Sequence, residues 1–270
     1  MIGVFTDQQA EDRYLAAYDK AARHWPVPVR DLDVETRFGP TRVRASGDAG
    51  PPLVLLPGTM GTALSWYPHV AELAERHRVY AVDTIGEPGR SRQTAPVLTN
   101  DDCAQWLIDV LDGLGHDQVR VAGVSRGGWL ALNLAIRAPA RVAGVTAIEP
   151  AGFALIGYSF ILWSMGEMVR WLRPRKSGDI RRVMRPLLFG SRKYRAHHPP
   201  QYLFTDDELR AITAPTRIVL AERSIIHPAR EVAARIGPLN PLIDVEVVPR
   251  TTHALSLQRP DLVTERILGS

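Results

Sequence analysis

The sequence predicts an α/β fold, in which a doubly wound and mostly parallel sheet carries an inserted helical cap. Short apolar runs without polar alternation recur along the chain, as in strands that are buried on both faces. Helical stretches separate these runs. Residues 151–210 interrupt this alternation, because their sequence predicts helices and no obvious strand of the main sheet. We therefore expect a core of residues 1–150 and 211–270, with residues 151–210 as the cap.

The chain begins with a predicted helix and hairpin. Thr6 and Gln9 have the spacing of a capping box, which starts a helix over residues 6–23. The prolines of WPVPV end it, because proline lacks the N–H that a helix needs. Residues 31–38 and 41–47 then alternate apolar and polar side chains around a Gly-Pro pair, which predicts a hairpin with one solvent-facing side.

The remaining core elements follow in order. The buried strands are expected at 52–58, 78–83, 119–125, 142–150, 216–222 and 245–249. The helices between and after them are expected at 65–76, 100–114, 127–138, 228–236 and 260–268. Pro260 suits the first turn of the last helix, where a missing N–H is tolerated.

The composition excludes several classes of protein. Of the 270 residues, 45% are apolar and 23% charged, which are ordinary globular values and exclude wholesale disorder. Cys103 is the one cysteine, so neither a disulfide framework nor a cysteine-based zinc site is expected. The first residues lack the features of a secretory signal, and we expect a cytoplasmic protein. A net charge of +4 is too small to indicate a nucleic-acid partner.

The expected cap has an apolar part and a basic part. Residues 153–166 carry no charge, but this run is shorter than the roughly 20 residues that span a bilayer, so no stable membrane insertion is expected. The stretch from Arg170 to Arg195 contains ten lysines and arginines but a single acidic residue, Asp179. This basic segment is either a solvated helix face or a surface that faces an anionic substrate or an acidic carrier protein.

GVSRGG at 123–128 lies where a predicted buried strand meets a predicted helix. This is the GxSxG pattern in the strand–turn–helix context that it requires, and it makes Ser125 the candidate nucleophile. The alternative is a purely structural glycine turn. Acyl transfer also needs two N–H groups aimed at the developing oxyanion. We expect them from Arg126, the residue after the nucleophile, and from Thr59 in the glycine turn LLPGTMG.

His253 is the candidate general base among eight histidines. It follows the last predicted strand and precedes the final helix, which places it at the same edge of the sheet as Ser125. By contrast, His24, His69, His77 and His116 lie on or beside predicted helices, where a surface role is expected. His197 and His198 fall in the expected cap, and His227 precedes a helix.

Together these motifs resemble the α/β-hydrolase superfamily, in particular its capped serine esterases and lyases. The turn DTIGEPGRS at 83–91 is similar to their D-x-x-G-x-G-x-S turn, with one additional residue. The resemblance covers residues 53–61, 78–91, 119–138, 142–150 and 216–268. It departs from the family where Pro57-Gly58 replaces the usual His-Gly, and where Ser224 occupies the usual place of the triad acid.

The triad acid therefore needs another source. Some members of the superfamily place it at the end of the strand before the cap, which here implies Glu149. Glu222 is a second candidate, and a dyad without an acid or a site that no longer hydrolyses remains open. The side chain of Arg126 could bind a substrate carboxylate or phosphate, or it could point away and pair with Glu149 or Asp83.

The sequence thus predicts a serine hydrolase that cleaves an ester, thioester or lactone of a largely apolar small molecule. Met60, Phe153 and Trp163 are expected to line the substrate pocket, although apolar cap residues could equally pack the cap onto the core. No nucleotide or metal motif is present, so no cofactor and no metal are expected. The alternatives are a lyase or cyclase on the same scaffold and a non-catalytic receptor.

Overall fold

The architecture was derived from a computed structural model, which describes residues 1–155 and 181–269 and, within them, all side chains except those of residues 181–183. Eight strands form the main sheet in the order β10-β9-β7-β6-β4-β5-β3-β2. In chain order they are β2 (Arg30–Val34), β3 (Thr41–Ser46), β4 (Pro52–Leu56), β5 (Arg78–Val82), β6 (Val119–Val124), β7 (Val142–Ile148), β9 (Thr216–Arg223) and β10 (Ile243–Thr252).

The pairing of these strands confirms the predicted doubly wound, mostly parallel sheet. Strands β5, β4, β6, β7, β9 and β10 are parallel to one another, whereas β3 is antiparallel to β5 and forms a hairpin with β2 at one edge. Because the chain winds from β4 outward in both directions, the carboxyl ends of β4 and β6 lie side by side. Ligands of open α/β sheets bind at such a switch point.

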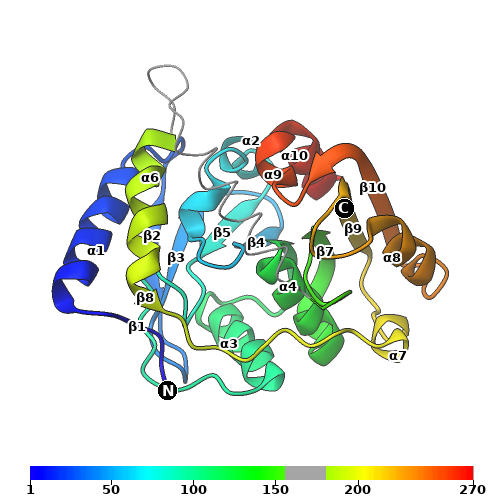
Figure 1. Cartoon of the computed structure of the whole chain (residues 1–270), viewed down its shortest axis with the longest axis horizontal. Helices are drawn as coiled ribbons and strands as arrows, with labels where there is room; N and C mark the ends of the chain where they lie inside the picture. The colour runs from blue at the N-terminus through cyan, green and yellow to red at the C-terminus, as the bar shows by residue number, and fades with distance from the viewer. Residues whose placement is uncertain (156–180, 270) are drawn as a thin grey trace.

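Helices cover both faces of the sheet (Figure 1). The helices of the described residues are α1 (Gln8–Ala22), η1 (Ala63–Trp66), α2 (Val70–Ala74), α3 (Asn100–Gly113), α4 (Arg126–Arg137), η2 (Pro139–Arg141), α6 (Arg181–Gly190), η3 (Ser191–Lys193), α7 (Asp206–Arg210), α8 (Ala229–Ile236), α9 (Leu255–Gln258) and α10 (Pro260–Leu268). Helices α3, α4 and α8 pack on one face, and α1, α2 and α10 pack on the other.

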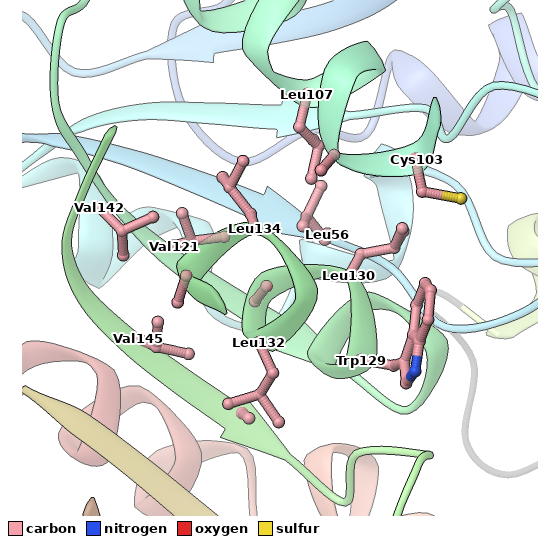
Figure 2. Packing of buried hydrophobic residues seen from close by; sticks show 14 of the residues in the cluster. Leu56, Cys103, Leu107, Val121, Trp129, Leu130, Leu132, Leu134, Val142 and Val145 are labelled. Atoms are coloured by element: carbon pink, nitrogen blue, oxygen red, sulfur yellow. The ribbon is translucent and has the colours of Figure 1, made fainter. Parts of the chain in front are cut away.

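Alternation along β4 divides the core into two clusters. Val54 and Leu56 join the cluster under α3 and α4, while Leu53 and Leu55 join the cluster on the opposite face. Figure 2 shows the first cluster, in which Leu132 and Leu134 of α4 lie beside Val121 of β6 and Val145 of β7. Strand β4 is thus apolar and buried on both sides. Its packing in the first cluster holds α4 and the turn before α4 in place.

Two predicted helices differ at their ends. The first begins at Gln8, and Asp7 rather than Thr6 is its cap, with the Asp7 side chain accepting the N–H of Ala10. Thr6 instead donates its N–H to the carbonyl of Lys193, next to the short pairing of β1 (Val4–Phe5) with β8 (Tyr194–Arg195). The helix predicted at 65–76 is divided into η1 and α2, because Pro68 has no N–H for a continuous ladder.

The segment predicted as a cap lies between two neighbouring strands of the sheet. Strand β9 pairs directly with β7. The segment between them in sequence is therefore an insertion that does not separate the two strands in the sheet. The described part of this segment contributes α6, η3, β8 and α7, and none of these belongs to the main sheet. Helix α6 packs beside α1 (Figure 1). The strand β8 was not expected, since this region was predicted to be helical.

Candidate active site

Ser125 lies in the sharp turn between β6 and α4. Its φ of 54° and ψ of −115° are a strained conformation for a residue with a side chain. The turn is held in place because the N–H of Ser125 donates to the carbonyl of Ile148 over 2.9 Å. This conformation lifts the hydroxyl above the carboxyl end of the sheet, at the N-terminus of α4.

The flanking glycines are required by close backbone approach. A Cβ on Gly123 would lie 2.2 Å from the backbone of Gly127, and a Cβ on Gly127 would lie 2.2 Å from the carbonyl oxygen of Leu56. The end of β4 therefore touches the turn directly. A Cβ on Gly58, in the loop after β4, would lie 3.4 Å from the Cβ of Ser125. This contact brings the loop that contains Thr59 to the nucleophile.

His253 follows β10, and its two ring nitrogens contact the two other groups of a possible proton-transfer chain. Its Nε2 lies 3.1 Å from Ser125 Oγ, and its Nδ1 lies 3.0 Å from Glu149 Oε2. A carboxylate can only accept, so Nδ1 carries the proton and Nε2 is left to accept the proton of the Ser125 hydroxyl. The structure thus brings together the three residues that the sequence selected as nucleophile, base and acid.

Glu149 is fully buried directly after β7, with a positive φ of 47°. One carboxylate oxygen accepts the N–H of Ala221 over 2.5 Å, and the other accepts the hydroxyl of Ser224 over 2.7 Å in addition to His253. Burial alone would raise the pKa of Glu149. The hydrogen bond with His253, the adjacent imidazoles and the Ala221 N–H outweigh it and lower that pKa below its ordinary value.

His227 is a second imidazole beside the same carboxylate, and the sequence did not reveal it. Its Nε2 lies 3.7 Å from Glu149 Oε1, and its side chain is fully buried. Burial lowers the pKa of His227, although the charge of Glu149 opposes this shift. The sequence held no signal for this contact, because no local pattern connects His227 with Glu149. His69 and His77 are buried as well, contrary to the expected surface roles.

Glu222, the second candidate for the acid, lies apart from His253. Its carboxylate accepts hydrogen bonds from Arg230 over 2.6 Å and from the N–H of Arg250 over 2.9 Å. The Arg250 N–H and the Arg230 guanidinium lower the pKa of Glu222. These contacts assign Glu222 to a surface ion pair at the end of β9.

The loop after β4 carries the expected donor Thr59, which is exposed, and the half-buried Met60. Met60 has a positive φ of 60°, and its N–H donates to Glu87 Oε2 over 3.0 Å. Arg126 begins α4, and the first N–H groups of a helix have no partner within it. Both expected oxyanion donors therefore belong to segments that adjoin Ser125.

The side chain of Arg126 turns inward and meets an acid that the sequence analysis did not consider. Its Nε lies 3.6 Å from Glu87 Oε1, and both side chains are almost fully buried. The expected partners, Glu149 and Asp83, are engaged elsewhere. Burial lowers the pKa of Arg126, while the charge of Glu87 opposes the shift. No local sequence pattern connects Glu87, in the turn at 83–91, with Arg126.

Of the expected apolar pocket residues, Phe153 is buried against other rings. Its ring centroid lies 5.7 Å from that of Phe204 and 6.4 Å from that of His227. Trp163 lies outside the described residues. Within residues 1–155 and 181–269, no group of three or more His, Cys, Asp or Glu side chains could hold a metal ion. In the same ranges no helix is long and apolar enough to cross a bilayer.

A serine, an imidazole and a buried carboxylate linked in this way can carry out nucleophilic acyl transfer. The imidazole can take the serine proton as the oxygen attacks, and the carboxylate stabilises the cation that forms. Strand ends and one strained turn supply all three groups, so their geometry is fixed by the core of the sheet.

Known proteins share this arrangement of elements. Residues 53–266 match the model described as the alpha/beta hydrolase family. An uncharacterized carboxylesterase, nap, of Bacillus subtilis (strain 168) is 31% identical over 95% of this chain and 91% of its own length. Carboxylesterase YbfK of the same strain is 31% identical over 95% of this chain and 93% of its own length.

Solved structures agree over nearly the whole chain. The crystal structure of naproxen esterase from Bacillus subtilis has a TM-score of 0.85 at 30% identity and covers 96% of both chains. The crystal structure of the carboxylesterase CesB (YbfK) from Bacillus subtilis has a TM-score of 0.86 at 30% identity, and covers 97% of this chain and 98% of its own. The similarity therefore extends over the strands and loops that carry Ser125, Glu149 and His253.

Proposed function

The chain belongs to the α/β hydrolase family, and on that premise we propose that it is a carboxylesterase with Ser125, His253 and Glu149 as its catalytic triad. The observation that carries this proposal is the continuous chain of contacts from Ser125 Oγ through His253 to Glu149, at 3.1 and 3.0 Å. Its carboxylesterase relatives support the same reaction class.

The reaction proceeds through an acyl-enzyme. Ser125 Oγ attacks the ester carbonyl carbon while His253 Nε2 takes the hydroxyl proton. The N–H groups of Thr59 and Arg126 stabilise the oxyanion. The C–O bond of the ester then breaks, and His253 returns the proton to the leaving alcohol. Water repeats the sequence on the acyl group, which leaves as the acid and restores Ser125.

The substrate is a largely apolar ester, and thioesters or lactones are accepted where they fit. One structural relative is a naproxen esterase. In this proposal residues 151–210 form the cap, and Met60, Phe153 and Trp163 line the pocket with apolar surface. No described contact favours a lyase, a cyclase or a receptor over hydrolysis.

A finer proposal concerns the basic segment and the site of action. Among its described residues, the side chains of Arg185, Arg192, Lys193 and Arg195 are exposed. We propose that they attract anionic substrates or an acidic carrier protein, and that the enzyme acts in the cytoplasm.

Hydrolysis of p-nitrophenyl esters tests the proposed function. The purified wild-type protein is expected to release p-nitrophenol and the free acid, with faster turnover of butyrate than of acetate. Ser125→Ala is expected to lose at least about 10⁴-fold in kcat while its thermal unfolding stays cooperative. Wild-type protein without turnover of any ester, thioester or lactone, or Ser125→Ala with activity near wild type, would contradict the proposal.

A further inference from the structure

The carboxylate of Glu87 lies at a junction of three chain segments near the nucleophile. Oε2 accepts the N–H of Met60 over 3.0 Å. Oε1 lies 3.6 Å from Arg126 Nε and 3.1 Å from His198 Nε2. The Glu87 side chain is only 1% exposed, so these partners replace water around it. None of these contacts takes part in the proton-transfer chain described above.

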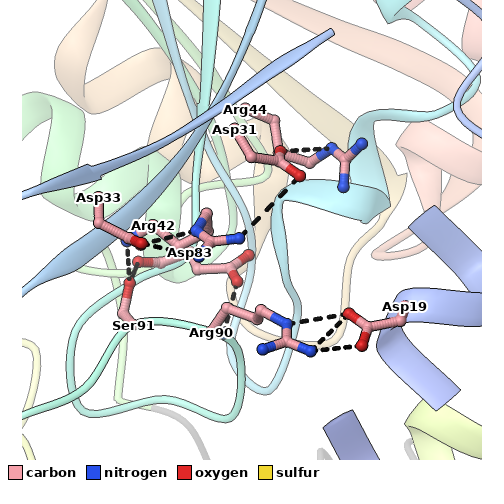
Figure 3. Close-up of polar contacts among 8 residues, drawn as sticks. All are labelled: Asp19, Asp31, Asp33, Arg42, Arg44, Asp83, Arg90 and Ser91. Atoms are coloured by element: carbon pink, nitrogen blue, oxygen red, sulfur yellow. Dashed lines mark hydrogen bonds and ion pairs between the residues drawn. The ribbon is translucent and has the colours of Figure 1, made fainter. Parts of the chain in front are cut away.

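Glu87 is carried by a turn that is itself firmly held. The carboxylate of Asp83 accepts the N–H of Arg90 over 2.7 Å, and the Ser91 hydroxyl donates to the Asp83 carbonyl over 2.6 Å (Figure 3). Arg90 also forms an ion pair with Asp19 of α1, as Figure 3 shows. Because both ends of the turn are fixed, Glu87 offers its partners a carboxylate in a defined place.

The turn at 83–91 holds the segment after β4, which contains Thr59, at two points. Asp83 accepts the N–H of Ala63 over 2.7 Å, and Glu87 accepts the N–H of Met60. Met60 has a positive φ, which is strained for a residue with a side chain and persists only where surrounding contacts impose it. The hydrogen bond to Glu87 is such a contact. It acts on the residue next to Thr59, one of the two proposed oxyanion donors.

The same carboxylate also faces the other donor residue. Arg126 supplies the second proposed N–H, and its buried guanidinium lies beside Glu87. Among the described residues, the Nε and Nη1 atoms of Arg126 have no hydrogen-bond partner. The charge of Glu87 offsets the burial of this cation more than the Cys103 thiol does. One side chain is thus positioned to set the separation between the loop after β4 and the start of α4.

We propose that Glu87 is a positioning residue, which holds the Met60 N–H and thereby places the oxyanion hole relative to Ser125. The inference rests on the proposed function. Oxyanion donors act only when they lie within hydrogen-bond distance of the transition-state oxygen. A displacement of about 1 Å can cost about 100-fold in rate. Loss of the hydrogen bond should therefore lower kcat and leave KM nearly unchanged.

A matched pair of double variants tests this role. Glu87→Gln/Arg126→Met keeps an acceptor for the Met60 N–H and leaves no charge in the pair. Glu87→Leu/Arg126→Met also leaves no charge but removes the acceptor. With a p-nitrophenyl ester, we expect kcat of the leucine variant to be about 10- to 100-fold below that of the glutamine variant. Affinity for a trifluoromethyl ketone, which mimics the tetrahedral intermediate, should fall by a similar factor.

Equal kcat values in the two folded double variants would overturn the proposal. If either variant fails to fold, Glu87→Asp provides the decision, because it keeps the charge beside Arg126 and withdraws the carboxylate from Met60. It is expected to lower kcat in the same way, and wild-type kcat would overturn the proposal. Asp109→Asn is the control, since Asp109 accepts the N–H of Arg37 over 3.0 Å and pairs with its exposed guanidinium. Wild-type and Ser125→Ala kinetics test the proposed function separately.

Discussion

Ser224 Oγ donates a hydrogen bond of 2.7 Å to Glu149 Oε2, the oxygen that His253 Nδ1 also contacts. The resemblance to the superfamily gives the position of Ser224 to the triad acid. In this chain the carboxylate that contacts His253 comes instead from the end of β7, and the serine at the usual position donates a hydrogen bond to it. The two residues are separated by 75 positions in sequence, yet they meet at neighbouring strand ends.

The first prediction separates the two candidate acids. Glu149→Gln should lower kcat by about 10⁴-fold with p-nitrophenyl butyrate, because a neutral amide cannot stabilise the imidazolium and can select the wrong tautomer. Glu222→Gln is the matched control and should stay within about twofold of wild type, since the Glu222 carboxylate is bonded to Arg230 and to the backbone of Arg250. The reverse pattern would move the acid to Glu222.

The second prediction exchanges the two positions. Glu149→Ser alone should be as impaired as Glu149→Gln. Adding Ser224→Glu should restore at least about 10-fold of the lost kcat, because the 2.7 Å contact shows that a longer side chain at position 224 reaches the place of the missing carboxylate. Ser224→Gln in the same background controls for side-chain volume. Equal activities of the glutamate and glutamine versions would show that position 224 cannot supply the acid.

Much of the site could be predicted because its geometry follows from strand ends. Ser125, Glu149 and His253 each follow a parallel strand, and such strands all end at one edge of the sheet. The glycines around Ser125 reflect local steric needs, which short sequence patterns record. Glu87 and His227 are different, since their partners come from distant segments that no local pattern connects to them.

Much of the fold could also be predicted, because its strands leave a local record in the sequence. Strands that are buried on both faces, such as β4 and β6, have continuous apolar sequences. The helix predicted at 65–76 was wrong in its continuity, because Pro68 has no N–H with which to continue the helical hydrogen bonds. The start of α1 was misplaced because pairing of β1 with β8, more than 180 residues away, draws Thr6 toward Lys193.

The third prediction concerns stability and pH. Burial lowers the pKa of His69 from 6.5 to about 4, while its Nδ1 lies 2.9 Å from Thr264 Oγ1. Between pH 6.5 and 4 the unfolded chain therefore binds a proton that the folded chain does not. The free energy of unfolding should fall by about 3 kcal/mol from this group as the pH falls through that range.

Urea unfolding at several pH values measures this effect. His69→Gln should have a flatter pH dependence of the free energy of unfolding between pH 6.5 and 4. His24→Gln, at the exposed end of α1, should keep the wild-type slope. A wild-type slope in His69→Gln would show that other groups control the acid instability.

The fourth prediction tests the basic segment. Electrostatic steering is screened over about 8 Å at physiological ionic strength. For an anionic ester such as mono-p-nitrophenyl glutarate, kcat/KM should fall as salt rises from low to physiological levels, while p-nitrophenyl butyrate should show no such fall. Replacement of the exposed Arg192, Lys193 and Arg195 by glutamate should remove the salt dependence. An unchanged salt dependence would make this segment only a solvated face.

The most direct measurement is mass spectrometry of the protein during turnover. Rapid quenching after mixing with p-nitrophenyl acetate should reveal one added acetyl group per chain, located on the peptide that contains Ser125. A burst of p-nitrophenol of the same stoichiometry should precede steady turnover, because acylation by this activated ester is expected to be faster than deacylation. Ser125→Ala should show neither the adduct nor the burst. Steady ester hydrolysis with no adduct at Ser125, or with the acetyl group on another residue, would contradict the account.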